Sequence, residues 1–184
     1  MELVKTSDFK KIYNDMSFQF PATELKSYES FQKILGENYL AYDVIEGGIP
    51  VGYIILFVRQ NFIFIDYVAI FKEFHSKGYG GKILETLKDK FNSKKGCFLE
   101  VEKPDENSPN TLRRIKFYQK HDAEKLAVNY LYPNESGFLP MDLYYIKYNA
   151  PAEYQEMKNF FGELFETVHG DLAHSKEILR KIFN

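Results

Sequence analysis

The feature that most constrains this chain is a glycine-rich octapeptide, residues 75–82, which reads HSKGYGGK between an apolar segment and an amphipathic one. Its three glycines within four positions allow the backbone to approach a ligand closely and to turn amide groups outward. If a helix begins here, those amides lie at the positive end of its dipole, where phosphate groups bind. Lys77 and Lys82 add positive charge. The octapeptide therefore predicts an anion site at a strand-to-helix turn.

The segments around the octapeptide predict a β-loop-α-β unit. Residues 61–70, which read NFIFIDYVAI, are strongly β-prone, and their almost continuous apolar character suits a strand covered on both faces. Apolar residues then recur at helical spacing over about 80–95, and Gly96 is predicted to end this helix. Residues 97–102, CFLEVE, predict the returning strand.

Capping residues, glycines and prolines divide the rest of the chain into further elements. The predicted elements are an edge strand at 2–5, a helix capped by Ser7 or Asp8 and running to about 16, a helix over about 23–35, a hairpin of 39–46 and 51–59 about Gly47 and Gly48, a helix starting at Ser108 and Pro109, and strands at 123–132 and 139–148. This mixture of strands and helices favours an α/β (α+β) fold.

The last residues, 150–184, predict a helical extension beyond a domain formed by residues 1–149. An apolar stripe at helical spacing, interrupted only by Gly162, comprises Tyr154, Met157, Phe160, Phe161, Leu164, Phe165 and Val168. Asp171 is predicted to cap a second, short helix. Such a stripe either packs on its own domain or forms a homodimer contact, and the sequence leaves both open.

Composition and charge narrow the classes of partner. A formal net charge of -2 argues against nucleic acid, because duplex binding usually requires a basic stripe. No apolar run reaches the roughly 20 residues of a membrane span and no secretory signal is visible, so we expect a cytoplasmic protein with no membrane partner. A single cysteine excludes an internal disulfide and a multi-cysteine zinc site, and the histidines show no metal-ligand spacing, so no metal is expected.

Two segments resemble motifs of the GNAT superfamily of N-acetyltransferases. Residues 68–84, VAIFKEFHSKGYGGKIL, are similar to motif A, whose loop reads Arg/Gln-x-x-Gly-x-Gly/Ala, with Gly78 and Gly80 on the two required positions. Residues 110–123, NTLRRIKFYQKHDA, resemble motif B, a helix that ends in a Phe-Tyr pair. The resemblance implies a GNAT fold over residues 1–149, with a mixed central sheet of about six or seven strands flanked by helices. Departures from the usual pattern stand at His75, Thr111 and Asp122.

The resemblance also implies an activity and a cofactor. An N-acetyltransferase of this family moves an acetyl group from acetyl-CoA to a primary amine, here of a small molecule or peptide, by direct attack in a ternary complex. The residues expected to contact the cofactor are Val68, Ala69, Ile70, His75, Ser76, Lys77, Gly78, Tyr79, Gly80, Gly81 and Lys82. The departures from the motifs leave open a second function, a catalytically inert sensor or interaction module that binds an acyl-CoA on the same fold.

Three residues are candidates for proton transfer. Tyr118 stands at the motif-B position whose hydroxyl usually faces the thioester sulfur, so it would protonate the leaving thiolate. Asp66, the lone acid in an apolar strand, is the first candidate for the base, followed by Glu100 and then Glu102. The alternative for Asp66 is a structural carboxylate bound to a backbone amide or a tyrosine. An acetyl-cysteine intermediate at Cys97 is disfavoured, because no histidine is near it in sequence to lower its pKa.

The acceptor pocket is expected from two segments that usually build it in this family. These are residues 17–26, which contain Phe18, Phe20 and Glu24, and residues 130–138, which contain Glu135. Aromatic and acidic side chains together would suit a cationic amine with an apolar body, although for each residue taken singly ordinary packing or a solvated acid is the better explanation.

Overall fold

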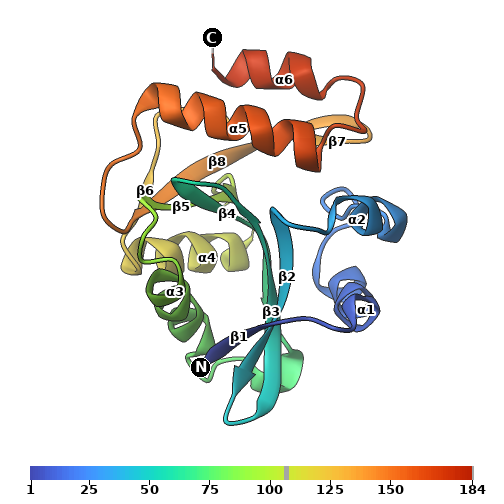
Figure 1. The fold of residues 1–184 in the computed structure, drawn as a ribbon, viewed down its shortest axis with the longest axis vertical. Helices are drawn as coiled ribbons and strands as arrows, with labels where there is room; N and C mark the ends of the chain where they lie inside the picture. Colours follow the sequence, from blue (N-terminus) through green and yellow to red (C-terminus); the bar gives the residue numbers. More distant parts are fainter. Residues whose placement is uncertain (106–107, 184) are drawn as a thin grey trace. The chain divides into compact units, whose positions relative to one another are not determined.

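The computed structural model describes residues 1–105 and 108–183, which form an open, mixed sheet of eight strands with six α-helices (Figure 1). The strands are β1 (Glu2–Lys5), β2 (Tyr39–Glu46), β3 (Ile49–Val58), β4 (Phe62–Ile70), β5 (Gly96–Glu102), β6 (Ala123–Lys125), β7 (Leu131–Asn134) and β8 (Gly137–Lys147). The helices are α1 (Phe9–Gln19), α2 (Tyr28–Ile34), α3 (Tyr79–Lys90), α4 (Pro109–Lys120), α5 (Tyr154–Val168) and α6 (Ser175–Ile182), with a short 3-10 helix η1 (Lys72–Phe74).

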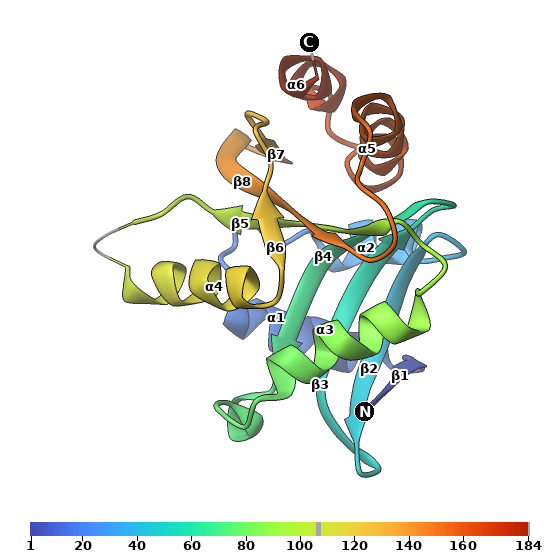
Figure 2. The same cartoon turned by 90° about the vertical axis from the view of Figure 1, so that its left-hand side faces the viewer.

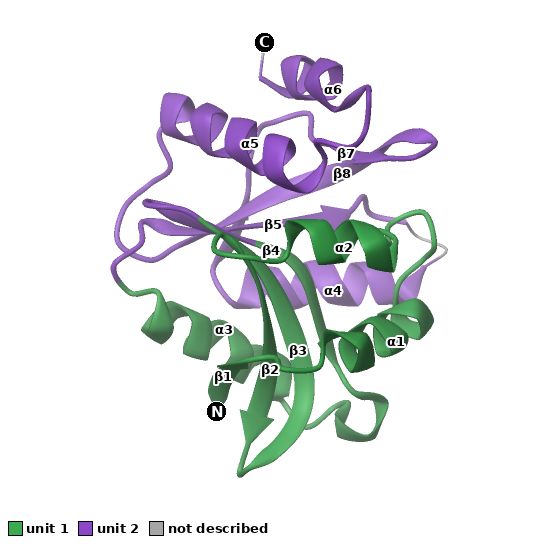
Figure 3. Cartoon of the chain, turned by 45° about the vertical axis from the view of Figure 1, so that its right-hand side comes forward, with its two compact units in different colours: residues 1–58, 65–92 green, residues 59–64, 93–184 purple. Residues whose placement is uncertain are grey.

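The strands hydrogen-bond in the order β1-β2-β3-β4-β5-β8-β6, and β7 pairs with β8 beside this path. β4 and β5 are neighbours joined through α3, so the β-loop-α-β unit predicted around the octapeptide is present. The chain forms two compact units (Figure 3). Unit 1 comprises residues 1–58 and 65–92, and unit 2 comprises residues 59–64 and 93–184.

Unit 1 contains a three-stranded antiparallel meander, β1-β2-β3, and the second half of β4. The β2–β3 hairpin turns at Gly47 and Gly48, whose φ angles of 59° and 80° only glycine adopts readily. Within this unit, α1 and α2 lie on one face of the strands and α3 lies on the other (Figures 1 and 2). Phe31 of α2 joins the layers, because its ring contacts Phe9 of α1, Tyr39 of β2 and Tyr67 of β4.

The bounds of α1 and α2 in unit 1 differ from the sequence-based prediction. Asp8 caps α1 as predicted and accepts a hydrogen bond from the Lys11 amide at 3.2 Å, but the helix continues to Gln19. α2 begins at Tyr28, not at residue 23, and its cap is Ser27. The segment before Ser27 is held by tertiary contacts instead, which outweigh its helical propensity.

In unit 2, β5 and β8 form the longest ladder, in a register that pairs Gly96 with Lys147 and Glu102 with Met141. The prediction that Gly96 ends a helix is wrong, because α3 ends at Lys90 and Gly96 is the first residue of β5. A Cβ atom at Gly96 would lie 2.4 Å from the Tyr145 ring, so the glycine serves close strand packing. The Lys95 amide donates to the Asn61 carbonyl at 2.7 Å, so the residue before β5 already pairs with the residue before β4.

The single strand predicted over residues 123–132 is two strands in the structure. β6 pairs with the second half of β8, and β7 pairs with its beginning, so that Ala123 lies opposite Ile146 and Leu131 lies opposite Pro140. Between them the Leu126 amide still bonds to the Leu143 carbonyl at 2.8 Å, after which the chain leaves the ladder. The partner strand β8 is long enough for both, which the sequence pattern of residues 123–132 does not indicate.

The C-terminal extension lies in unit 2, and its apolar stripe forms α5 as predicted, with Gly162 inside the helix. Phe160 and Phe161 of α5 contact Phe98 of β5, with ring centroids 5.5 and 5.2 Å apart. α6 packs beside α5 (Figure 1). Its N-cap is His174, three residues after the predicted Asp171. In the described part of the chain, no helix combines the length and apolar character that crossing a bilayer requires.

Candidate cofactor loop and active-site residues

The C-terminal half of β4, which carries Val68, Ala69 and Ile70, is held very close to β3. A Cβ atom added to Gly52 of β3 would lie 2.2 Å from the Ala69 carbonyl oxygen and 3.0 Å from the Ile70 Cα. Only glycine fits at this position without displacing backbone. The Phe71 amide continues the pairing by donating to the Val51 carbonyl at 2.9 Å. The strand end predicted to contact the cofactor is therefore fixed to its neighbour.

The loop after β4 presents the N-terminus of α3, as the octapeptide predicts. Ser76 and Gly78 have φ angles of 62° and 79°, in the left-handed region, and Gly78 is the N-cap. α3 begins at Tyr79, one residue before the predicted start, and no side chain in the described part of the chain caps it. The amides of Tyr79, Gly80 and Gly81 stand in the first turn, where backbone N–H groups have no acceptor within the helix. This arrangement can bind an anion such as a diphosphate.

His75 does not reach out from the loop but folds back onto it. Its Nε2 lies 2.8 Å from the Ile70 carbonyl oxygen, so this nitrogen carries a proton and donates it. The side chain of Gln19 donates to the same oxygen at 3.2 Å. The Ile70 carbonyl therefore already has two donors, and it is not open to a ligand in this arrangement.

The two lysines of the octapeptide have different surroundings. The Lys77 ammonium lies 4.9 Å from the centre of the Phe74 ring. Lys82 donates to the carboxylate of Glu46, which also forms an ion pair with the amino group of Met1. The hydrogen bond from Lys82, followed by that from the Met1 amino group, lowers the pKa of Glu46, and Glu46 in turn raises the pKa of Lys82. Lys82 therefore places a positive charge on α3, and the Glu46 carboxylate partly neutralises it.

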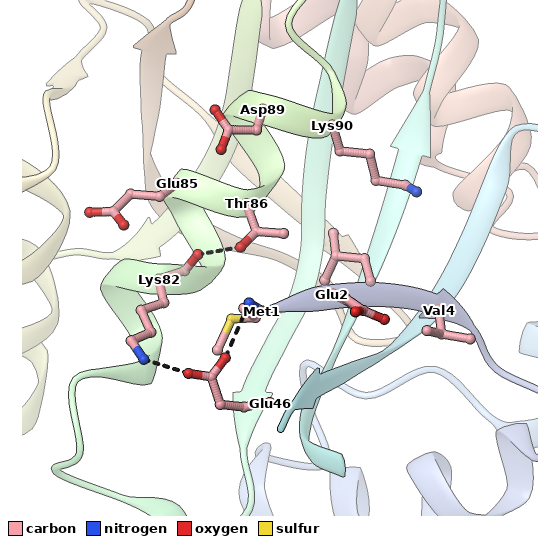
Figure 4. Close-up of a pocket in the computed structure, with 10 residues that line it drawn as sticks. Met1, Glu2, Val4, Glu46, Lys82, Glu85, Thr86, Asp89 and Lys90 are labelled. Atoms are coloured by element: carbon pink, nitrogen blue, oxygen red, sulfur yellow. Dashed lines mark hydrogen bonds and ion pairs between the residues drawn. The ribbon is translucent and has the colours of Figure 1, made fainter. Parts of the chain in front are cut away.

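The ion pair of Lys82 and Glu46 borders a cavity of about 750 Å³ between β1 and α3 (Figure 4). The cavity is lined by Met1, Glu2, Leu3, Val4, Glu46, Lys82, Glu85, Thr86, Asp89 and Lys90. Its carboxylates outnumber its lysines, so it is poorly suited to a diphosphate. The phosphate-binding groups predicted by the octapeptide are the amides at the start of α3, outside this lining.

Asp66 lies in β4 with its side chain only 1% exposed. Its Oδ2 accepts a hydrogen bond from the Tyr39 hydroxyl and another from the Lys26 ammonium at 3.2 Å. The Lys26 side chain is itself 11% exposed and lies over the Tyr67 ring. These contacts favour the structural role for Asp66, the alternative that the sequence leaves open. Neither Tyr39 nor Lys26 belongs to a sequence motif that could have revealed the cluster.

Tyr118 and Glu100, the other proton-transfer candidates, lie in unit 2. Tyr118 is a buried residue of α4, and burial is the main cause that raises its pKa to about 12. The hydroxyl therefore stays protonated at neutral pH. Glu100 lies in β5, where it pairs with Leu143 of β8. Glu102, two residues on, forms an ion pair with Arg114 of α4.

Cys97, the candidate for a covalent intermediate, is fully buried in β5. Its Sγ lies 3.4 Å from the Phe98 carbonyl oxygen, to which the thiol donates. Burial removes the access that a reactive thiolate requires. Among the described residues, no group of three or more His, Cys, Asp or Glu side chains is arranged to hold a metal ion.

The predicted acceptor residues lie at the end of α1 and just after it: Phe18 is in its last turn, Phe20 is its C-cap and Glu24 follows. Phe18 is 89% exposed, which is unusual for a phenylalanine. The Phe20 ring packs edge-on against Tyr67 with centroids 5.1 Å apart, and the Tyr67 hydroxyl donates to the Glu24 carbonyl. The backbone after α1 is thus anchored to β4, while Phe18 faces solvent.

Comparison with known proteins supports the resemblance seen in the sequence. The acetyltransferase (GNAT) family matches the chain over residues 8–122. A curated relative, YjbC of Bacillus subtilis (strain 168), named as a candidate acetyltransferase, is 31% identical over 163 residues, which cover 85% of this chain and 80% of the relative.

Solved structures show the same fold. A GNAT-family protein from Bacteroides thetaiotaomicron superposes with a TM-score of 0.74 at 24% identity, covering 91% of this chain and 96% of that one. An aminoglycoside 6'-N-acetyltransferase complexed with coenzyme A superposes with a TM-score of 0.59 at 13% identity, covering 83% and 99%. The predicted fold class is confirmed, and the chain belongs to the GNAT family of acetyltransferases.

Proposed function

We propose that this acyltransferase moves an acetyl group from acetyl-CoA to a primary amine of a small molecule or peptide, by direct attack in a ternary complex. The observation that carries the proposal is the start of α3, where Gly78, Gly80 and Gly81 leave first-turn amides available to a diphosphate. A structural neighbour complexed with coenzyme A supports the choice of cofactor. Family membership supports the reaction class.

The reaction combines one acyl transfer with two proton transfers, one from the amine and one to the leaving thiolate. The neutral amine nitrogen attacks the carbonyl carbon of the thioester, a C–N bond forms and the C–S bond breaks. A lysine-like amine has a pKa of about 10.4, so a base must take its proton, directly or through water. The departing thiolate of coenzyme A takes a proton, and we assign this step to the Tyr118 hydroxyl. Burial raises the pKa of Tyr118 to about 12, so the hydroxyl keeps its proton at physiological pH and has it to donate, although the higher pKa also makes it a weaker acid.

We propose that the base is either Asp66 or Glu100. The hydrogen bonds from Tyr39 and Lys26 to Asp66 make that carboxylate the weaker candidate. We therefore place Glu100 first, which reverses the order that the sequence favours. Direct attack is preferred to an acetyl-cysteine intermediate, because Cys97 is fully buried.

The acceptor is proposed to be an amine with an apolar body. The exposed ring of Phe18 supports this choice, since it offers apolar area beside the segment that contains Glu24. The name of the coenzyme A-bound neighbour describes an N-acetyltransferase of an aminoglycoside, an amine-bearing small molecule.

Two measurements on the full chain test the proposed function. Thermal-shift titration with acetyl-CoA should raise Tm, and a thiol-release assay over a panel of polyamines, aminoglycosides and N-terminal peptides should then find turnover with at least one amine. Stabilisation without turnover on any amine would support the inert acyl-CoA sensor instead. Absence of stabilisation at millimolar acetyl-CoA would overturn both functions.

A further inference from the structure

The peptide group between Ile70 and Phe71, where β4 ends and the loop before α3 begins, has every hydrogen-bonding position filled. Its N–H, on Phe71, donates to the Val51 carbonyl of β3 at 2.9 Å. Its carbonyl oxygen, on Ile70, accepts from His75 Nε2 at 2.8 Å and from Gln19 Nε2 at 3.2 Å. A carbonyl oxygen has two lone pairs, so both are used. This peptide cannot rotate without breaking three bonds.

The bond from Gln19 belongs to a longer chain of contacts. Gln19 Nε2 also lies 2.6 Å from Asp15 Oδ2, one turn earlier on α1. The same Asp15 oxygen accepts from the Tyr53 hydroxyl of β3 at 2.9 Å. Burial, and then the hydrogen bond to Asp15, strongly raises the pKa of Tyr53, so its hydroxyl remains a donor. The chain of contacts therefore runs from β3 through α1 to the Ile70 carbonyl, and all its members lie in unit 1.

His75 completes this arrangement from the other side. It stands three residues before the N-cap Gly78, and its own amide donates to the Lys72 carbonyl at 3.2 Å, which closes η1. With its ring on the Ile70 carbonyl, the loop forms a closed turn between the end of β4 and Ser76. The backbone leaves this turn at Ser76, whose φ angle of 62° lies in the left-handed region.

We infer that His75 and Gln19 are positioning residues, which hold the peptide between Ile70 and Phe71 so that the amides at the start of α3 are oriented before the cofactor arrives. This inference rests on the proposed coenzyme A site. A loop that is ordered in advance loses less conformational entropy on binding, so its affinity is higher. In this arrangement His75 donates a hydrogen bond to the main chain and not to phosphate, and the Ile70 carbonyl accepts hydrogen bonds from the protein and not from the ligand.

Calorimetric titration with coenzyme A tests the inference on purified full-length variants. His75→Ala and Gln19→Ala should each raise Kd about three- to tenfold, the range expected for one net hydrogen bond. His75→Gln should restore most of the affinity, because the glutamine amide can donate from a similar position. Gln155→Ala, which removes an exposed glutamine that bonds to Asn159 on α5, is the matched control and should bind as the wild type does.

Hydrogen exchange without ligand gives a second, independent readout. The Phe71 amide should exchange faster in His75→Ala and in Gln19→Ala than in the wild type, because each variant removes one of the three hydrogen bonds that hold this peptide group. Unchanged exchange and unchanged Kd in both variants would overturn the inference while leaving the proposed function intact. A loss of affinity in both His75 variants with none in Gln19→Ala would also overturn it, because His75 would then contact the ligand itself. If the wild type binds no coenzyme A, the proposed function fails first.

Discussion

At the scale of single residues, Asp66 is where sequence position and environment favour different roles. A lone acid in an apolar strand is a reasonable candidate for a catalytic base. In the structure its carboxylate joins Tyr39 of β2 and Lys26 of the segment before α2. The nearly buried Lys26 ammonium needs this counter-charge, because a charged group removed from water is costly unless it is paired. We therefore expect Asp66 to contribute mainly to the stability of unit 1.

Replacing Asp66 with Asn should accordingly reduce stability more than chemistry. Breaking a buried ion pair typically costs about 3 kcal/mol or more, which corresponds to roughly 6 to 12 °C in Tm for a chain of this size. Chemical denaturation measures the free energy of unfolding, and Asp89→Asn, an exposed acid on α3, is the control. A fall in kcat of about a hundredfold or more at unchanged stability would instead identify Asp66 as the base.

Tyr118→Phe tests the proposed acid. Removing the hydroxyl should slow turnover at least tenfold and leave the Kd of acetyl-CoA unchanged, since general acid catalysis contributes about 10²- to 10⁴-fold. Because burial raises the pKa of Tyr118 to about 12, the wild-type rate should show no Tyr118 ionisation between pH 6 and 10. A pH–rate profile of both proteins checks this, and turnover equal to the wild type would remove Tyr118 from the mechanism.

At the scale of secondary-structure elements, the sequence predicts best where local chemistry decides. The β2–β3 turn at Gly47 and Gly48 and the N-terminal region of α3 after Gly78 follow from residues that are adjacent in the chain. The start of α2 does not, because residues 23–26 are held by contacts from β4, such as the hydrogen bond from the Tyr67 hydroxyl to Glu24. Such contacts between distant residues have no signal in a local pattern.

The close approach of β3 to β4 makes Gly52 a test of how these elements position the site. Gly52→Ala would place a Cβ 2.2 Å from the Ala69 carbonyl oxygen, so the strands must separate there. We expect a loss of stability of about 1 to 3 kcal/mol and weaker acetyl-CoA binding, because the end of β4 moves. Thermal unfolding and calorimetry measure the two effects.

Gly162→Ala on α5 is the matched control for that substitution. Apart from its chain neighbours and the backbone of its own helix, no described atom lies within 4 Å of the position of its Cβ, so alanine should stabilise the helix by up to about 1 kcal/mol. Equal effects of the two substitutions on stability and on binding would contradict the account of Gly52.

At the scale of the whole molecule, one carboxylate in unit 2 links stability to pH. Asp142 of β8 accepts hydrogen bonds from Lys125 at 2.7 Å and Lys103 at 3.0 Å, and its side chain is 2% exposed. Burial raises the pKa of Asp142, but these hydrogen bonds outweigh it, so the pKa is lower than usual. A lowered folded-state pKa gives stability that is present above the unfolded value of about 3.9 and is lost as pH falls through the folded value.

The stability difference between the wild type and Asp142→Asn should therefore be constant from pH 6 to 8 and shrink below about pH 4. Denaturant unfolding at several pH values measures it, with Glu124→Gln, an exposed acid on β6, as the control. A difference that does not depend on pH would mean that Asp142 contributes by packing and not by its charge.

The sequence predicts the site less completely than the fold. Glycine spacing predicts the loop before α3, because the glycines that favour a backbone anion site lie within four positions of one another. The contacts of Ile70 with Gln19, and of Gln19 with Asp15, join residues far apart in the chain or unremarkable in type, so no motif reveals them. Gly52 likewise reads as an ordinary strand glycine until the neighbouring strand is placed beside it.

The most direct test of the account follows the backbone amides of ¹⁵N-labelled protein during titration with coenzyme A. The amide resonances of Gly78, Gly80 and Gly81 should shift most, and in a saturable manner, if the diphosphate binds at the start of α3 as proposed. Resonances of α5 and α6 should move little. Glycine resonances that stay unchanged at millimolar coenzyme A, or shifts confined to other elements, would contradict it.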